Sequence, residues 1–459
     1  MPDPREPVDP RDPDDRRGGL DPDKPRDVPN VPVTPGGPEQ PEPGGAELPP
    51  GAAVSQVDPR ILMRQEGFAG YWTEFKRRVR GGELGSLPVI CGLIVIWIVF
   101  QSLNDRFLSA QNLSNLSIQI ASTGLIAVGI VWVLLLGEID LSIGSVSGVS
   151  AAILAVLNIN HGWSDAAAIA AAVGVGCGIG LIQGFFFAKI GVPAFVVTLA
   201  GLIGWQGLQL YILGSQGTIN LRYNSTIHKL TSYYFEYVAV GYGIAGACVL
   251  VYAVSRYLQY KRRTEAGLPT IPIQDIAFRT AVLAVIAFAV AYVLNQWYGT
   301  PLALVIFLAF VIVGDLILRR TAYGRKMYAV GGGVEAARRA GISVPLIRIS
   351  AFVICSTMAA IGGIFAASRI VSAGQSTGSG DVLTNAIAAA VIGGTSLFGG
   401  RGSTYSALLG MLVIGSISSG MDLQSVNSSV KLMITGAVLL AAVVLDSVSR
   451  RSQKASGRA

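Results

Sequence analysis

Residues 116–137 read LSIQIASTGLIAVGIVWVLLLG, a run of 22 residues without a charged side chain. A helix needs about 20 predominantly apolar residues to cross the hydrocarbon core of a bilayer, so this run predicts a transmembrane helix. Eleven other stretches have a similar character. The twelve expected segments are residues 88–103, 116–137, 139–158, 166–188, 193–214, 238–258, 276–294, 301–318, 346–368, 383–399, 404–420 and 430–447.

These segments predict an all-α polytopic membrane protein. The composition agrees, because 51% of the residues are hydrophobic and only 14% are charged, whereas soluble proteins average about 25% charged residues. The segments are rich in small residues, which let helices approach closely in lipid. Segment 383–399 is short and broken by glycines, so a re-entrant geometry is an alternative to a full crossing. We therefore expect about 10–12 transmembrane or re-entrant helices.

The first 59 residues differ in composition from the rest. They hold 16 of the 22 prolines and 13 of the 28 acidic residues, with almost no large apolar side chains. Such a segment buries too little surface to offset its chain entropy, so residues 1–59 are expected to form a disordered, Pro-rich cytoplasmic tail. Aromatic residues beside a basic cluster predict an interfacial amphipathic segment at 60–85. The transmembrane domain is expected at 86–450, followed by a cytoplasmic tail at 451–459.

The basic residues of the connections predict the orientation. With the N-terminus inside, the connections expected in the cytoplasm carry 19 basic residues and those expected outside carry five. The positive-inside rule therefore places both termini in the cytoplasm. The cytoplasmic set is Lys76, Arg77, Arg78, Arg80, Arg256, Lys261, Arg262, Arg263, Arg319, Arg320, Arg325, Lys326, Arg338, Arg339, Arg348, Arg450, Arg451, Lys454 and Arg458. The outside set is Arg106, Arg222, Lys229, Arg369 and Lys431.

Cysteine and histidine usage argues against a metal site and against a disulfide framework. The four cysteines lie singly in apolar runs, and neither His161 nor His228 has a second metal ligand nearby. Acid–base or metal chemistry needs a cluster of such side chains, so the chain is not expected to be an enzyme. We expect no metal, no cofactor bound by this chain and no nucleic-acid partner.

The segment 137–145, GEIDLSIGS, places two carboxylates between two apolar segments. Carboxylates are expensive near the membrane core and are usually functional there, which favours a functional role for Glu138 and Asp140. The alternative is a turn in which Asp140 caps the following helix, with Ser142 assisting. Span counting places both carboxylates near the cytoplasmic end of segment 116–137, and a break in that segment would place them deeper.

The segment 393–403, GGTSLFGGRGS, also joins two apolar segments and faintly echoes the first. Its five glycines have the composition of a phosphate-binding loop. However, the Gly-x-x-x-x-Gly-Lys-Ser/Thr pattern of ATPases is absent from the sequence. The alternative to a functional loop is close helix packing around a turn.

The segment 323–342, YGRKMYAVGGGVEAARRAGI, is the longest cytoplasmic connection expected to be ordered. Residues Val334–Ala340 predict a short amphipathic helix that follows a glycine hinge and ends at Gly341. A short cytoplasmic helix of this kind is well shaped for docking on a soluble partner. The alternative is a loop on the membrane surface.

These three segments resemble the signature stretches of the ribose/xylose-type permeases of ABC importers, a family that includes branched-chain amino acid permeases. The resemblance covers about residues 86–450. Three features most resemble the xylose-transport branch of this family. They are the run 420–447, the added length between residues 215 and 300, and Glu138, where ribose-type members tend to have Gly. The chain departs from the family at Gly333, where relatives usually have Asn, and at Ala340, where they often have Ser.

The resemblance implies a plasma-membrane permease that imports a monosaccharide, xylose or a similar sugar, by alternating access. It implies a homodimer, cytoplasmic ATP-binding subunits that hydrolyse ATP, and an extracytoplasmic sugar-binding protein. The residues expected in the substrate pathway or gate are Glu138, Asp140, Ser142, Thr395 and Ser396. The residues expected in coupling to the ATPase are Tyr328, Gly331, Gly333, Glu335, Ala336, Ala337 and Gly341.

The main alternative function is an ion-coupled secondary sugar transporter. Such a protein buries ionisable residues in mid-span as a relay. The central parts of the predicted spans instead hold little beyond four glutamines, Gln119, Gln183, Gln206 and Gln209. Specificity in an importer of this kind resides largely in the separate binding protein, so the sequence leaves the choice among xylose, glucose, ribose and similar sugars open.

Overall fold

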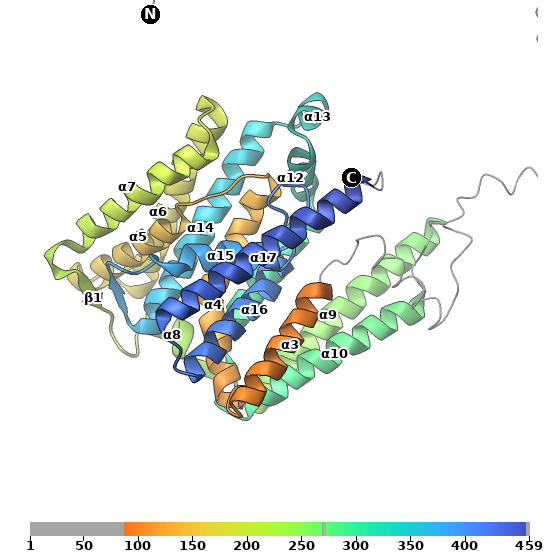
Figure 1. Ribbon diagram of the computed structural model, residues 1–459, viewed down its shortest axis with the longest axis horizontal. Coiled ribbons are helices and arrows are strands. Elements are labelled where there is room, and N and C mark those ends of the chain that lie inside the picture. The colour runs from red at the N-terminus through yellow and green to blue at the C-terminus, as the bar shows by residue number, and fades with distance from the viewer. Residues whose placement is uncertain (1–86, 269, 271, 456–459) are drawn as a thin grey trace, which may run out of the picture. The chain divides into compact units, whose positions relative to one another are not determined.

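The computed structural model describes residues 87–268, 270 and 272–455, and most of this chain is helical (Figure 1). The predicted tail at 1–59 and the predicted interfacial segment at 60–85 lie outside the described residues. Within the described chain, nine helices are long and apolar enough to cross a membrane. They are α4 (Ala110–Leu135), α5 (Ile143–Ala155) with the π-helical turn Val156–Asn160, α6 (Asp165–Phe185) with the π-helical turn Phe186–Ile190, α7 (Ala194–Leu213), α9 (Val238–Glu265), α10 (Ile273–Asn295), α11 (Leu302–Arg320), α14 (Val344–Ile370) and α16 (Thr404–Leu423).

Three shorter apolar helices complete the set: α3 (Leu87–Leu103), α15 (Asp381–Ile392) and the first part of α17 (Ser428–Ala455). These twelve helices coincide with the twelve apolar stretches of the sequence, which confirms the all-α polytopic fold. One boundary was wrong, because the predicted segment 383–399 ends as a helix at Ile392 and continues as a loop. Its glycines Gly394 and Gly399 adopt φ angles of 109° and 82°, which a right-handed helix does not accept.

The small elements lie at the ends of the bundle. Helices α12 (Ala322–Gly332) and α13 (Val334–Arg339) connect the end of α11 to the start of α14 and lie at one end of the bundle. The opposite end carries α8 (Thr226–Ser232) and two antiparallel strand pairs. Strand β1 (Thr218–Asn220) pairs with β4 (Ser372–Gly374), and β2 (Tyr234–Phe235) pairs with β3 (Thr300–Pro301).

Helix α4 is the centre of the core. From Leu116 to Leu135 every residue except Gln119 and Thr123 is buried, and the helix contacts α14, α16, α11 and α15. Its start is fixed by Ser109, whose hydroxyl accepts a hydrogen bond from the backbone N–H of Asn112, the usual geometry of a helix N-cap. A helix buried on all sides in this way provides a fixed reference against which the surrounding elements pack.

Helices α6 and α14 pack at very short distance through three glycines spaced four residues apart. A Cβ atom on Gly180 would lie 2.6 Å from the Phe352 carbonyl oxygen, and one on Gly184 would lie 2.9 Å from the Ile349 Cα. Gly176 faces Ala360 in the same row. Close backbone approach through small residues is the main way in which helices associate in lipid, where no hydrophobic effect drives them together.

Helices α9 and α10 form a hairpin that packs mainly on itself. Its buried residues are Gly241 and Ala245 in α9, and Ala291 and Leu294 in α10. All four lie toward the end of the bundle that carries the short strands. The rest of the hairpin surface is apolar and exposed in the single chain, as expected for helices that contact lipid. The hairpin occupies most of the stretch between residues 215 and 300.

Candidate functional site

The three sequence segments singled out above meet at one point, where glycine backbones touch. The Gly400 N–H donates a hydrogen bond of 2.9 Å to the carbonyl oxygen of Leu135, at the end of α4. A Cβ atom on Gly399 would lie 2.8 Å from the Gly137 nitrogen and 2.9 Å from the Gly331 oxygen. A Cβ atom on Gly331 would overlap the Leu135 carbonyl oxygen. We call Gly137, Gly331, Gly399 and Gly400 the glycine junction.

The glycine junction needs glycine for two separate reasons. Gly137, Gly399 and Gly400 adopt φ angles of 78°, 82° and 73°, a region that other residues rarely occupy. Gly331 lies within helix α12, so its requirement is space rather than conformation. The junction therefore joins α4, α12 and the 393–403 loop with no side chain between them.

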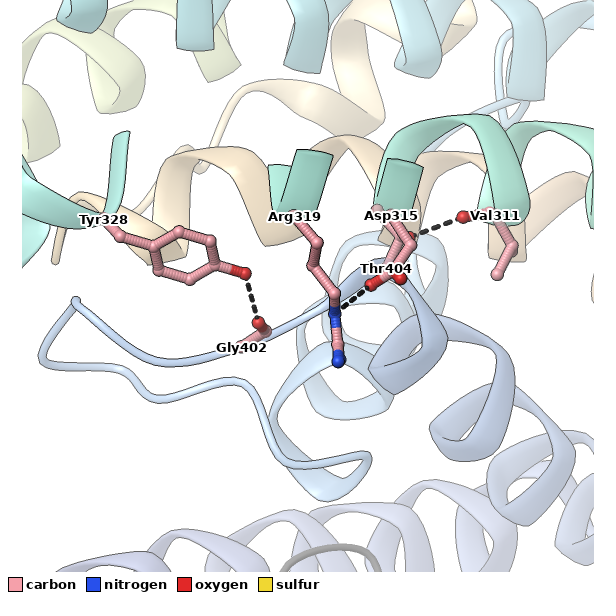
Figure 2. A network of polar contacts seen from close by, with 6 residues as sticks. All are labelled: Val311, Asp315, Arg319, Tyr328, Gly402 and Thr404. Atoms are coloured by element: carbon pink, nitrogen blue, oxygen red, sulfur yellow. Dashed lines mark hydrogen bonds and ion pairs between the residues drawn. The ribbon is translucent and has the colours of Figure 1, made fainter. Parts of the chain in front are cut away.

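Side-chain contacts extend the junction toward α11 and α16 (Figure 2). The Tyr328 hydroxyl of α12 donates a hydrogen bond of 2.7 Å to the carbonyl oxygen of Gly402, and the Thr404 hydroxyl donates one of 2.6 Å to the carbonyl oxygen of Val311. On α11, Arg319 Nε lies 2.8 Å from Asp315 Oδ1. Burial raises the pKa of Tyr328, and the nearby Arg319 charge opposes the rise, so Tyr328 acts as a hydroxyl donor.

Helix α13 has one face on the bundle and one face in solvent. Ala337 is 3% exposed and belongs to the core, while Glu335 and Ala336 are exposed. The helix begins after Gly333, and its cap residue is Ala340, one residue earlier than the predicted cap. Gly341 follows with a φ of 76°, a common left-handed end for a helix. Its outward face is therefore held rigidly but left uncovered within the described chain.

Glu138 lies close to the start of α14. Its Oε1 atom is 3.8 Å from Arg348 Nη2, and both side chains are about a quarter exposed, at 24% and 25%. The Arg348 guanidinium also lies 4.6 Å from the ring centroid of Phe187, a cation–π contact. Burial raises the pKa of Glu138, and the positive charge of Arg348 opposes that rise.

Asp140 lies deeper in the bundle than Glu138. Its side chain is 2% exposed and lies beside Cys355, the twelfth of the 27 residues of α14. Asp140 Oδ1 accepts two hydrogen bonds from Ser142, one of 2.8 Å from the backbone N–H and one of 2.6 Å from the hydroxyl. Gln183 Nε2 donates a bond of 2.8 Å to the same hydroxyl. Asp140 Oδ2 has no hydrogen-bond partner of ordinary geometry within the described residues.

Thr395 and Ser396 lie in the 393–403 loop and are almost fully buried, at 1% and 4% exposed. The Ser396 hydroxyl accepts a hydrogen bond from the Phe398 N–H at 3.2 Å, and the Ser396 N–H donates to the Arg401 carbonyl at 2.9 Å. A Cβ atom on Gly402 would lie 2.9 Å from Thr395 Oγ1. These contacts hold the loop in the shape that presents Gly399 and Gly400 to the glycine junction.

The structure thus groups the candidate residues into four sets. Gly331 is part of the glycine junction, and Tyr328, Thr395 and Ser396 lie beside it. The others lie around it: Asp140 and Ser142 in the buried turn before α5, Glu138 at the edge of α14, and Gly333, Glu335, Ala336, Ala337 and Gly341 in or beside α13. Sequence reasoning missed Arg348 as the partner of Glu138, since it counted only as a cytoplasmic charge. It also missed the Leu135 carbonyl, which no side-chain pattern signals.

In the part of the chain that the structure describes, a bundle of twelve apolar helices with buried carboxylate and glycine loops defines a multi-pass α-helical membrane protein. Residues 112–443 match the family model described as branched-chain amino acid transport system / permease component, and the chain belongs to this family. It is similar to the xylose transport system permease protein XylH of Escherichia coli strain K12, with 34% identity over 364 residues, or 79% of this chain and 92% of that protein.

Two further relatives agree with this assignment. The XylH protein of Haemophilus influenzae is 31% identical over 364 residues, which cover 79% of this chain and 96% of that protein. The ribose import permease protein RbsC of Bacillus subtilis is 31% identical over 374 residues, which cover 82% of this chain and 96% of that protein. No solved structure matches the chain.

Proposed function

We propose that this chain is the membrane-spanning permease subunit of an ATP-driven importer of a monosaccharide, xylose or a similar neutral sugar. The observation that carries the proposal is the similarity to xylose and ribose permeases across 79% to 82% of the chain. The glycine junction supports it, because a transport subunit driven by a separate motor needs a stiff connection between a docking element and the helices that it moves.

The partners follow from this assignment. A second copy of the chain would complete the pathway, a sugar-binding protein would deliver the substrate outside, and cytoplasmic subunits would bind and hydrolyse ATP. The exposed face of α13, with Glu335 and Ala336, is the docking surface that we assign to the ATP-binding subunit. Gly333 and Gly341, which flank the helix, set its position relative to α12 and α14.

In the proposed mechanism, closure of the ATP-binding subunits displaces α13 and with it α12. Because Gly331 touches Leu135 and Gly399 directly, the displacement reaches the end of α4 and the 393–403 loop. The adjoining turn, with Glu138, Asp140 and Ser142, then changes the cytoplasmic gate. Thr395 and Ser396 contribute by keeping the loop rigid. The chain supplies alternating access and no covalent chemistry.

The proposed orientation has both termini and α13 in the cytoplasm, as the distribution of basic residues predicts. Epitope tags at the two ends of the chain test this directly. Both tags should become accessible to antibody only after the inner membrane is permeabilised, whereas a tag inserted in the 222–225 turn should be accessible before that step.

The proposal is tested by uptake of labelled D-xylose in cells that carry this chain, the ATPase that co-purifies with it and the cognate binding protein. Uptake should require the chain and an ATPase able to hydrolyse ATP. Uptake that continues with an inactive ATPase, and stops when the proton or sodium gradient is removed, would instead identify a secondary transporter. Absence of uptake for every monosaccharide in a panel would refute the sugar assignment.

A further inference from the structure

A small hollow with both polar and apolar walls lies between the start of α5, helix α7 and the segment that precedes α15. Its volume is about 150 Å³. Ser145, Gln206, Gln209 and Ser379 supply polar groups to its lining, and Leu202 and Leu383 supply apolar surface. These residues come from three parts of the chain that are far apart in sequence. The hollow lies apart from the glycine junction, and the site described above does not use it.

Hydrogen bonds fix the walls of this hollow. Gln209 is 2% exposed, and its Nε2 donates to the carbonyl oxygens of Gly374 and Thr377 at 2.9 Å and 3.0 Å. The Ser145 hydroxyl donates to the carbonyl oxygen of Leu202 at 2.8 Å. Helix α7 is thereby tied both to α5 and to the segment before α15, so the hollow is a preformed feature.

Gln206 differs from Gln209 in having no partner. Its side chain is exposed in the single chain and forms no hydrogen bond with the described residues. Gln206 is the thirteenth of 20 residues in a mainly apolar spanning helix without charged side chains. A carboxamide left unpaired in lipid is strongly unfavourable, and polar groups inside a membrane pair with other protein groups or face a water-filled path or a ligand. Gln206 therefore faces a polar environment in the assembled protein.

The lining matches an uncharged polyhydroxyl ligand. None of the described lining residues carries a charge, and the nearest acidic residue along the chain, Asp381, accepts a hydrogen bond from Asn385. The carboxamide of Gln206 can both donate and accept hydrogen bonds. The N–H groups in the first turn of a helix such as α5 have no partners within the helix and can donate to a ligand. A cavity of about 150 Å³ is known to hold a six-membered carbon ring.

We propose that this hollow is a transient binding site for the pyranose ring of the transported sugar, with Gln206 hydrogen-bonding its hydroxyl groups. The inference rests on the proposed function and assigns the substrate contact within it. A zwitterionic amino acid would find no charged partner in this lining, so the site discriminates against such substrates. The distinction matters because the matched family is described by branched-chain amino acid transport.

Uptake by the full complex tests the contact. The variant Gln206→Leu removes the carboxamide and keeps the size of the side chain. Its D-xylose uptake per assembled complex should fall about tenfold, the effect of losing a hydrogen bond of ordinary strength. The matched control is Gln296→Leu, since Gln296 is an exposed glutamine at the end of α10, far from the hollow along the chain. The control should retain wild-type uptake.

A second measurement does not depend on uptake. The four native cysteines of this chain are first replaced by serine or alanine. In the complex that contains this chain, Gln206→Cys should then react with a water-soluble thiol reagent. D-xylose should slow the reaction, and L-leucine should not. A Gln296→Cys control should react at the same rate with and without xylose. An unreactive Gln206→Cys, or one that xylose does not protect, overturns the inference.

The two tests separate this inference from the proposed function. If the wild-type complex imports xylose and Gln206→Leu does so equally well, the hollow is not a sugar contact and the permease assignment stands. If the wild-type complex imports no sugar, the proposed function fails first.

Discussion

Glu138 and Asp140 are separated by one residue and contact different parts of α14. Glu138 meets Arg348, the fifth residue of that helix, while Asp140 lies beside Cys355, the twelfth. One oxygen of Asp140 accepts both bonds from Ser142, and the other has no hydrogen-bond partner of ordinary geometry among the described residues. An asparagine would provide the same acceptor without a buried carboxylate, so the fold alone does not require aspartate here.

Asp140→Asn should therefore insert and assemble normally, because its side-chain oxygen still accepts from Ser142. Uptake per assembled complex should nevertheless fall markedly if the carboxylate works in the gate, as we propose. Asp140→Leu, which leaves two Ser142 donors unpaired, should lower membrane abundance, at a cost of about 1–3 kcal/mol per buried unpaired group. Near-wild-type uptake by Asp140→Asn would limit the role of Asp140 to holding the turn.

Gly331 and Gly332 are adjacent glycines with opposite surroundings. A Cβ atom on Gly331 overlaps the Leu135 carbonyl, whereas one on Gly332 meets no atom within 4 Å. Gly331→Ala should destabilise the protein by about 1–3 kcal/mol or displace α12, with reduced thermal stability and reduced uptake. Gly332→Ala serves as the control and should behave as wild type. Equal behaviour of the two variants would show that the glycine junction is not a tight contact.

At the scale of elements, α13 is the part most clearly directed away from the bundle. Its inward residue, Ala337, is buried, and the ion pair between Glu335 and Arg338, at 3.1 Å, lies in solvent. An exposed pair of this kind contributes little to stability. Charge at Glu335 is therefore available for recognition of a partner.

Glu335→Arg should leave the protein inserted and stable but reduce the amount of ATPase that co-purifies with it. The control is Glu265→Arg, which reverses the charge of another exposed glutamate, paired with Lys261 at the end of α9. Gly341→Pro should also weaken the association, because proline cannot adopt the φ of 76° found there. The docking assignment fails if Glu335→Arg retains stoichiometric ATPase and normal uptake.

The spanning helices could be predicted from the sequence because length and apolar composition are local properties fixed by the bilayer. Helix α12 was treated as part of a connection, since its 11 residues are too few and too polar to form a transmembrane span. The contact between Gly331 and Leu135 depends on backbones nearly 200 residues apart. Gln206 was noted as a polar residue in a span. The hollow that it lines could not be predicted, because residues 144, 145, 378 and 379 also line it and lie far away in the sequence.

For the whole molecule, the largest unassigned part is the N-terminal tail, residues 1–59, which lies outside the described residues. Deletion of residues 2–58 should leave insertion and D-xylose uptake nearly unchanged, because the tail's composition provides no core-forming pattern. Membrane abundance and initial uptake rate are the measurements. A loss of uptake at unchanged abundance would show that the tail has a specific partner.

The α9–α10 hairpin has a consequence for the lipid around the protein. Its uninterrupted apolar stretches, residues 238–255 and 280–295, span about 27 Å and 24 Å at 1.5 Å per residue, less than the roughly 30 Å of a typical hydrocarbon core. The mismatch is relieved by local thinning of the bilayer or by Arg256 and Arg279 reaching toward the headgroups. Since the hairpin is buried only near one end, this adjustment falls mainly on the lipid that surrounds α9 and α10.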